Sequence, residues 1–370
     1  MNEVSDMTFT PIVVGLSIVT LTVLILPTSI KTIGENVELF FMFMGTIAVS
    51  ISGEWSWQLL HFALIDPVSI GIIPIGIFQV VLGVGLLLHF WNQRFFNGIH
   101  FLNRKLGHRL FIFSLIAISS LISGIISVIL TAVLLAEIVT TLPFSRKNKT
   151  QIVVSACYGM GLGAVLTPVA EPLSTVLVDK LSGPPYYAGF FFPLSTFGVY
   201  VIPGILLIAF ISSILIGRSL SFEPGETTSK AGSVHSETFK SVFTRAVRVY
   251  IFIAALTLLG AGLKPLVLMY FSKVPAWTMY WINIDSAFLD NATLASIELL
   301  PTMTLPQIIG AILGLLISGG MLIPGNIPNI IAAERLKIHM KEWAKIGIPV
   351  GLVLMTAYFL ILLIRYGGAF

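Results

Sequence analysis

Long apolar stretches recur along this sequence, each long enough to cross a lipid bilayer. They run at about 8–28, 37–53, 67–92, 110–143, 151–179, 187–217, 246–270, 306–333 and 346–366. A spanning helix needs about 20 mostly apolar residues, so the chain allows roughly eight to ten crossings. Charged residues make up only 10% of the chain, against about a quarter in soluble domains. The sequence therefore predicts an all-α polytopic membrane protein without a large soluble domain.

Two of these stretches have features that a single lipid-facing helix does not accommodate. The stretch 110–143 is too long for one helix and is interrupted at Ser123-Gly124. The stretch 279–300 gathers ionisable and amide side chains, which are expensive in lipid, namely Asp285, Asp290, Asn291 and Glu298. We interpret both stretches as re-entrant hairpins, which enter the membrane and leave on the same side.

Basic residues sort to one side of the membrane if both hairpins are re-entrant. Of the 21 Lys and Arg residues, only a few fall on the opposite face, namely Lys180, Lys264, Lys273 and Arg365. The positive-inside rule then places both termini outside a cell (plasma) membrane, although two ordinary double crossings would give the same sidedness. This bias also accounts for the basic pI of about 9.1, so we expect membrane lipid and no nucleic acid as a partner.

A weak internal repeat divides the chain into two transmembrane halves. We predict a first repeat over 1–217, a cytoplasmic linker over 218–244 and a second repeat over 245–370. Each half has a broken helix, at about 151–179 and about 306–333, with a Pro-x-x-x-Pro core formed by Pro168 and Pro172 or by Pro324 and Pro328. Because the hairpins open to opposite sides, the halves are predicted to be inverted repeats, which are typical of secondary transporters.

Both broken helices carry polar side chains where proline and glycine interrupt helical hydrogen bonding. These are Thr167 and Glu171 in the first half and Asn326 and Asn329 in the second. Freed backbone groups cannot face lipid, and unwound carbonyls are where transporters coordinate ions. The breaks are therefore candidate ion sites; the alternative is a helix kink with a packing role.

The pair Asp290-Asn291 lies in an otherwise apolar frame. A carboxylate beside an amide offers hard oxygen ligands for a small cation, and the carboxylate can also take a proton. We therefore hypothesise a Na⁺ site at Asp290, Asn291 and Asn326. The alternative role for Asp290 is an N-cap at the hairpin tip.

Two further intramembrane acids, Glu171 and Glu137, are candidates for proton or ion binding. For Glu137, a surface-facing position near Pro143 is an equal alternative. Glu298 and Asp285 are expected nearer the outer interface.

Hydroxyls take the place of the Asp-Asn pair in the first hairpin. Ser127 and Thr131 stand there where the second hairpin has Asp290 and Asn291. They are candidate ligands, although bonding back to a helical carbonyl is the more common fate of such hydroxyls.

Enzyme signatures are mostly absent from the sequence. It has no Cys/His metal spacing, no P-loop and no GxSxG. Its single cysteine, Cys157, excludes an internal disulfide. We expect no enzyme activity and no cofactor other than a coupling ion, Na⁺ or H⁺.

The segment Ser286-Ala-Phe-Leu-Asp290-Asn291-Ala-Thr293, followed by Gly325-Asn326-Ile-Pro328-Asn329, resembles the ion transporter superfamily. That group includes D-type sodium/proton antiporters, arsenite efflux pumps and sodium/dicarboxylate symporters. Within it, the chain most resembles a group of uncharacterised archaeal and bacterial cation transporters. The resemblance covers most of residues 110–181 and 280–350.

The resemblance implies two half-sites, each made by a hairpin and a broken helix. Asp290, Asn291, Asn326 and Asn329 would serve in the second half, and Thr167, Pro168, Glu171 and Pro172 in the first. The chain departs from this pattern in two ways: the first hairpin lacks Asp-Asn, and the first broken helix has Glu171 and Leu173 where an Asn is usual. Neither half has the Ser-Asn-Thr clamp of dicarboxylate carriers, which argues against dicarboxylates as substrates.

We expect a secondary active cation transporter of small inorganic ions, with sodium/proton antiport by alternating access as the leading hypothesis. The alternatives are an arsenite-type oxyanion exporter, an intramembrane carboxylate-dependent enzyme and a non-transporting scaffold. Superfamily members are often dimers, so a homodimer is one assembly that the resemblance implies.

Overall fold

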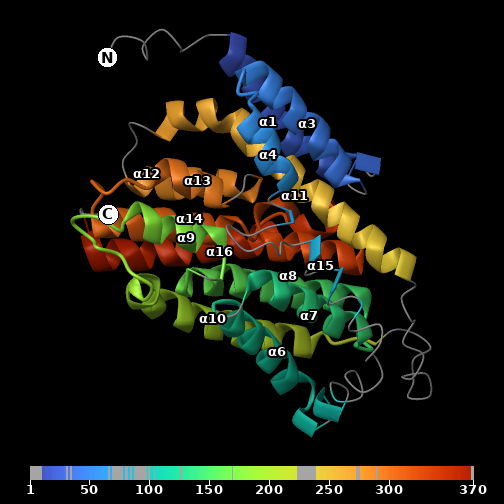
Figure 1. The fold of residues 1–370 in the computed structure, drawn as a ribbon. Coiled ribbons are helices and arrows are strands. Elements are labelled where there is room, and N and C mark those ends of the chain that lie inside the picture. Colours follow the sequence, from blue (N-terminus) through green and yellow to red (C-terminus); the bar gives the residue numbers. More distant parts are fainter. Residues whose placement is uncertain are drawn as a thin grey trace. The chain divides into compact units, whose positions relative to one another are not determined.

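The protein is helical throughout the part that the computed structural model describes (Figure 1). That part comprises residues 11–30, 32–33, 36–65, 67–68, 78–79, 82–83, 86, 98, 101–103, 105–125, 127–168, 170–222, 239–271, 276–288 and 291–367. Within these ranges the only β-type pairing is an isolated bridge between Phe144 and Phe222. The all-helical prediction is confirmed. The predicted linker and the apolar stretch 67–92 lie mostly outside the described residues.

Three described helices are long and apolar enough to cross a membrane. They are α10 (Phe192–Arg218), α16 (Met340–Tyr366) and the segment Ala246–Leu266 of α11 (Phe239–Phe271). On α16, large apolar side chains point outward, with Val353 69% and Ile364 85% exposed. So much exposed apolar surface on one helix requires an apolar surrounding, and this is a helical membrane protein.

The described chain forms two compact units, each built from more than one segment. The first unit comprises residues 1–78, 247–325 and 339–370, and the second comprises 79–246 and 326–338. The short segment 326–338 therefore belongs to the unit that is otherwise formed by residues 79–246. The compact units do not coincide with the predicted repeats, which stay a prediction.

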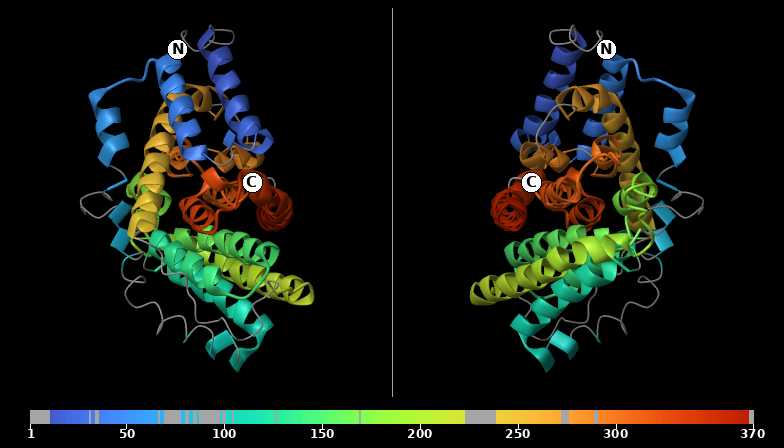
Figure 2. Two further views of the ribbon diagram at one scale, coloured as in Figure 1. Left: turned by 90° about the vertical axis from the view of Figure 1, so that its right-hand side faces the viewer. Right: turned by 90° about the vertical axis from the view of Figure 1, so that its left-hand side faces the viewer.

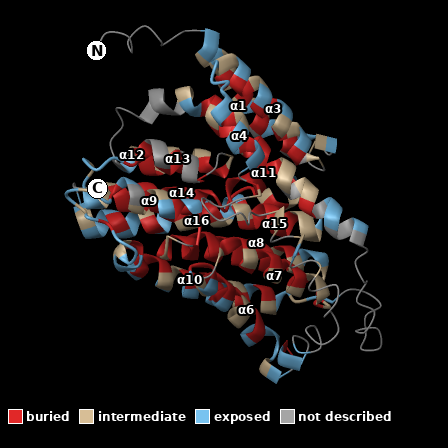
Figure 3. Cartoon of the chain, viewed as in Figure 1, coloured by how far each residue is buried: buried red, intermediate tan, exposed pale blue. Residues whose placement is uncertain are grey.

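In the first unit, the buried helix α14 (Leu305–Ser318) packs against α12 (Ala276–Ile282), η3 (Asn283–Ala287), α13 (Asn291–Glu298) and α16. Ten consecutive residues from Ile308 to Ile317 are buried; Figure 3 colours buried residues red. A helix that is apolar and buried all round serves as the core of its unit.

Helices α1 (Pro11–Ser29), α3 (Val37–Ser52), α4 (Trp57–Ile65) and α11 form the rest of the first unit. Gly45 of α3 lies close to α11, since a Cβ at this position would stand 3.0 Å from the carbonyl oxygen of Ala255. Such small residues let membrane helices approach each other closely.

In the second unit, α8 (Arg146–Gly163), α6 (His108–Ser123) and α10 each pack against the other two, and these helices lie side by side in both views of Figure 2. Gly159 and Gly163 face Ser120 of α6, and a Cβ on Gly159 would come within 2.9 Å of the Ser120 Cβ. The glycine spacing in Gly159-Met-Gly-Leu-Gly163 thus serves close helix packing in this unit.

The remaining helices of the second unit are α7 (Val128–Thr141), α9 (Pro172–Lys180) and α15 (Ile327–Leu336). Helix α15 packs against α7 and α8, although it follows them by almost two hundred residues (Arg335 and Glu137 are 198 apart). Arg146 binds the C-terminal end of α15 as well, because its Nη2 donates to Lys337 O at 2.7 Å.

Helices break at the predicted places. The stretch 110–143 is two helices, α6 and α7, separated at Gly124–Ser127. The two predicted broken helices are interrupted as well, by η2 (Ala164–Leu166) and the residues up to Pro172, and by Gly319–Leu322 and η4 (Ile323–Gly325). The same order of elements therefore occurs twice along the chain. Two helices separated by a break (α6 and α7, or α12–η3 and α13) are followed by a helix, a 3-10 turn and a short helix (α8, η2 and α9, or α14, η4 and α15).

Candidate functional site

A buried group of oxygen atoms surrounds Asn291 in the first unit. This group, the Asn291 cluster, consists of the side chains of Ser286 and Asn291 and the carbonyl oxygens of Leu315 and Gly325. Ser286 is fully buried and Asn291 is 2% exposed. The cluster lies where the break between η3 and α13 meets the break that follows α14, as both residue sets belong to the first unit.

The Asn291 amide faces only hydrogen-bond acceptors when its oxygen points into the cluster. In the reversed orientation its nitrogen donates to Leu315 O and Gly325 O, each at 3.3 Å, and to the Ser286 hydroxyl. Ser286 Oγ itself donates to Leu315 O at 3.1 Å. The reversed orientation satisfies the cluster by hydrogen bonds alone, and buried polar groups require such satisfaction.

Two glycines allow the backbone segments around the Asn291 cluster to approach each other closely. A Cβ on Gly319 would stand 2.8 Å from Asn291 Nδ2 and 2.9 Å from Gly325 O. A Cβ on Gly325 would stand 2.7 Å from Ser286 O. No side chain larger than hydrogen fits at either position without displacing backbone, so these glycines let unwound backbone and hairpin lie in contact.

The break after α14 is held in place by α16. The indole Nε1 of the fully buried Trp343 donates to Gly320 O at 3.1 Å. A Cβ on Gly347 would overlap Met321 O, so that carbonyl lies directly against α16. The freed carbonyls of the break are therefore fixed by named neighbours inside the unit.

A second polar group lies beside the Asn291 cluster. Asn283 Nδ2 donates to Glu298 Oε2 at 3.0 Å and to Ala311 O at 2.9 Å, and Ser318 Oγ donates to Asn283 O at 2.5 Å. Asn283 and Ser318 are fully buried, and Glu298 is 4% exposed. The carboxyl of Glu298 is enclosed by protein, and its expected place near the outer interface stays a prediction.

In the second unit, the two breaks are also joined by hydrogen bonds. Thr167 Oγ1 donates to Gly124 O at 2.6 Å, and Val128 N donates to Ala170 O at 3.2 Å. Thr167 therefore connects the broken helix to the first hairpin, as its pairing in the sequence analysis anticipated. A nearby hydroxyl, that of Ser174, closes the same turn by donating to Val165 O at 3.0 Å.

The hydroxyls of the first hairpin have structural partners. Ser127 caps α7 by accepting from Ile129 N at 3.3 Å. Thr131 Oγ1 donates to Ser127 O at 2.8 Å, which is the intrahelical alternative considered above.

Glu137 is held by an ion pair inside the second unit. Arg335 donates to it twice, from Nε to Oε1 at 2.7 Å and from Nη2 to Oε2 at 2.8 Å. This bidentate geometry is the strong form of an Arg–carboxylate contact. Glu137 is 4% exposed, so the surface-facing alternative does not describe it.

The other predicted residues occupy the helix starts that follow the breaks. Glu171 is 7% exposed and directly precedes α9, which Pro172 begins; Pro168 lies in the break before it. Proline suits these positions because a first-turn N–H has no helical partner.

The corresponding start of α15 belongs to the second unit. Pro324 lies in η4 and Pro328 in the first turn of α15, which Asn326 precedes in the N-cap position. Asn326 is 4% exposed and its side chain makes no cap bond; neither of its amide atoms has a hydrogen-bond partner in the described part of the chain. Asn329 is fully buried.

Asp290 lies outside the described residues, so its predicted place in the Na⁺ site stays a prediction. Within the described ranges, no group of three or more His, Cys, Asp or Glu side chains could hold a metal ion. Oxygens from hydroxyls, amides and carbonyls thus make up the described part of the site, a donor set that suits weakly held hard cations.

Sequence reasoning did not single out Asn283, Ser286 and Ser318 as site residues. A signal was present for each of them. Asn283 is an amide between isoleucines in an apolar stretch, and Ser318 directly precedes Gly319-Gly320 at the helix break. Polar residues inside spanning segments are functional candidates by default.

Comparison with known proteins connects the chain to one family. No protein with a curated description matches it. A family model does match over residues 13–365, which is nearly the whole chain. The chain therefore belongs to the family DUF1646, whose description is a protein of unknown function.

Proposed function

We propose that this protein is a secondary active cation transporter of the cell membrane, and that it exchanges Na⁺ for protons. The observation that carries the proposal is the Asn291 cluster, a buried set of oxygens at two helix breaks. Broken helices whose carbonyls line a buried polar site are the usual place of ion coordination in secondary transporters.

The Asn291 cluster brings several oxygens together in a buried place. They are the Ser286 hydroxyl, the side-chain oxygen of Asn291 and the carbonyl oxygens of Leu315 and Gly325. Hydroxyl, amide and carbonyl oxygens are ligands that small hard cations accept. This donor set supports the proposal of a cation site.

Asp290 would supply the negative charge that balances the cation, because it directly precedes Asn291 in the sequence. The second half-site would use Thr167 and Glu171, where the breaks of the second unit meet. We leave Glu137 out of the ion path, since Arg335 already neutralises it. The proposed arrangement in the membrane has both termini outside and re-entrant hairpins in inverted repeats.

Ion flux in proteoliposomes tests this function. With the full chain reconstituted and a pH gradient imposed, we expect uptake of radioactive Na⁺ by the wild-type protein. Asn291→Ala, Asp290→Asn and Glu171→Gln should each reduce this uptake strongly. Asn36→Ala serves as the matched control, because the Asn36 side chain bonds only to Thr32 O on an exposed surface.

Screening Li⁺, K⁺ and arsenite in the same vesicles identifies the substrate. The proposal fails if the wild-type protein moves none of the cations, or if Asn291→Ala and Asp290→Asn both transport at the wild-type rate.

A further inference from the structure

We infer that Glu298 is a proton-binding site of this protein, separate from the cation site at Asn291. The inference has two parts. That Glu298 binds a proton follows from the geometry of the first unit alone. That this proton takes part in exchange for Na⁺ rests on the proposed function. Its strongest observation is a carboxyl, 4% exposed, that a single neutral side chain donates to.

The partners of Glu298 compensate a negative charge poorly. Glu298 Oε2 accepts one hydrogen bond, from Asn283 Nδ2 at 3.0 Å. Glu298 Oε1 is buried and has no hydrogen-bond partner among the described residues. An isolated buried carboxylate is costly, and the group avoids this cost by binding a proton. The open Oε1 is the atom on which that proton would sit.

Asn283 can serve the carboxyl in both protonation states. Its amide nitrogen has two hydrogens, and both are used, toward Glu298 Oε2 and toward Ala311 O at 2.9 Å. Oε2 remains an acceptor whether Oε1 carries a proton or not. Protonation therefore changes the charge at this place without breaking the contact that positions the side chain.

Among the described residues, no basic group acts on this carboxyl from the elements packed against it. Helix α14 contains no ionisable residue, and η3 contributes only Asp285, which acts on Glu298 electrostatically. Helix α12 contributes Tyr280, whose hydroxyl donates to Met355 O at 2.7 Å. This contrasts with Glu137, which accepts two hydrogen bonds from Arg335.

The site is close enough to the Asn291 cluster for the two to influence each other. Asn291 and Glu298 are the first and last residues of α13, so they are separated by about 10 Å along the helix. The two sites also share a neighbour, because Ser318 Oγ donates to Asn283 O at 2.5 Å and lies 3.3 Å from Leu315 O, the carbonyl that Ser286 binds. A proton at Glu298 and a cation at Asn291 would thus be bound at opposite ends of one short helix.

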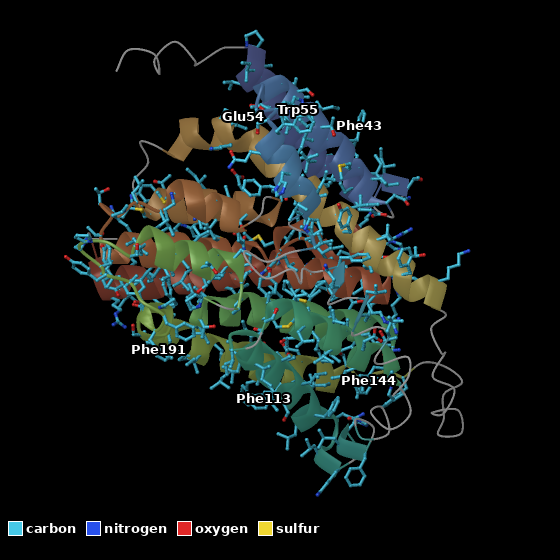
Figure 4. The ribbon with its side chains drawn as sticks, viewed as in Figure 1. Phe43, Glu54, Trp55, Phe113, Phe144 and Phe191 are labelled. Carbon is cyan, nitrogen blue, oxygen red and sulfur yellow. The ribbon has the colours of Figure 1, made fainter. Side chains whose placement is uncertain are left out.

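Infrared difference spectroscopy of the purified full chain tests the proton site without relying on transport. When the pH is changed, the wild-type protein should show the carbonyl band of a protonated carboxyl, and Glu298→Gln should lack one component of it. Glu54→Gln is the matched control, since Glu54 is exposed in the loop before α4 (Figure 4). An unchanged difference spectrum in Glu298→Gln overturns the inference.

A second variant keeps the inference testable if Glu298→Gln does not fold. Gln at position 298 keeps an oxygen for Asn283, and Asn283→Ala removes the donor while leaving the carboxyl in place. Asn283→Ala should shift the pH at which the carboxyl band changes; the same titration midpoint as in the wild type would contradict the geometry.

Flux measurements then separate this inference from the proposed function. Glu298→Gln should lose uptake of Na⁺ driven by a pH gradient and keep the exchange of Na⁺ for Na⁺. Full pH-driven uptake in Glu298→Gln overturns the role of the site in exchange. If the wild-type protein shows neither flux, the proposed function has failed, and the infrared result still decides whether Glu298 binds a proton.

Discussion

One amide side chain connects the start of α13 to the break after α14 in the first unit. Asn291 reaches the carbonyls of Leu315 and Gly325 and the hydroxyl of Ser286. Leu315 O also accepts from Gly319 N and from Ser286 Oγ, so Gly325 O, which lies in the break, is the carbonyl that depends most on the amide. A buried polar group that loses its partner costs about 1–3 kcal/mol, so we expect the amide to contribute to stability.

At Gly319, adding a single methyl group should disturb the cluster. The new Cβ in Gly319→Ala would stand 2.8 Å from the Asn291 amide and 2.9 Å from Gly325 O. We expect a loss of about 1–3 kcal/mol in stability, as for other overpacked sites. Protection of the protein by Na⁺ against thermal unfolding should weaken as well.

Gly183→Ala is the control for this substitution, because a Cβ at Gly183 meets nothing within 4 Å. Thermal unfolding in detergent, with and without Na⁺, measures both effects. Equal midpoints for Gly319→Ala and the wild type would show that the cluster has room that its distances do not indicate.

At the scale of elements, short helices behind the breaks are attached to their unit by a few polar contacts. Helix α15 is held on α7 by Arg335 and Glu137, and at its carbonyl end by Arg146. The helix is only ten residues long, too short to be stable by itself. Its tertiary contacts in the second unit therefore decide where it lies.

Breaking the Arg335–Glu137 pair should destabilise the protein strongly. Arg335→Gln leaves the carboxylate of Glu137, which is 4% exposed, without its bidentate partner. Removal of one member of a buried pair costs about 3–5 kcal/mol. Replacing both with apolar residues, as in Glu137→Leu with Arg335→Met, should recover most of this loss.

Thermal unfolding of the two single variants and the double variant measures the coupling. Arg335→Lys is an informative comparison, since it keeps the charge and loses the fork of two donors. A double variant that is as unstable as the sum of the two single variants would mean that the residues act independently.

The close contact of α6 and α8 should be sensitive to the smallest enlargement. In Gly163→Ala the Cβ would overlap Ser120 O and stand 3.0 Å from Ser123 Oγ. Since the obstacle is backbone, the helices must separate, and we expect a lower unfolding temperature. In the control Gly198→Ala on α10, the nearest atom is Leu194 Cδ1 at 3.5 Å, an ordinary contact.

At the scale of the whole molecule, apolar surface is the dominant property. Large apolar side chains are exposed on α10 and α16, including Val199 at 56% and Val353 at 69%. In water such surface would drive aggregation, and in a bilayer it is solvated by acyl chains. The chain is therefore expected to require detergent or lipid during purification.

Spin labels can test which surface meets lipid. The only cysteine, Cys157, is fully buried, so Cys157→Ala gives a background for single labels. A label at Val353→Cys should be relaxed by oxygen, which concentrates in lipid. A label at Glu54→Cys, in the polar loop shown in Figure 4, should be relaxed by a water-soluble nickel complex. The reverse pattern would contradict a lipid-facing α16.

Much of the fold could be predicted from the sequence because membrane insertion depends on local properties. Apolar stretches of sufficient length predicted the long helices. Gly124 and Gly319-Gly320 predicted where helices end, and Pro172 lies where the next helix begins. Length, hydropathy and backbone breaking are each read from neighbouring residues. The same reasoning anticipated that Thr167 and Asn291 lie at breaks.

Tertiary structure alone decided which distant groups meet. That Glu137 pairs with Arg335, and that Asn283 positions Glu298, depends on contacts between separate helices. No local pattern distinguishes a carboxyl beside an arginine on another helix from one beside an amide. The sequence by itself determined that this chain is a helical membrane protein with polar breaks. Only the packing decided which of its buried acids lies beside an arginine and which lies beside an amide.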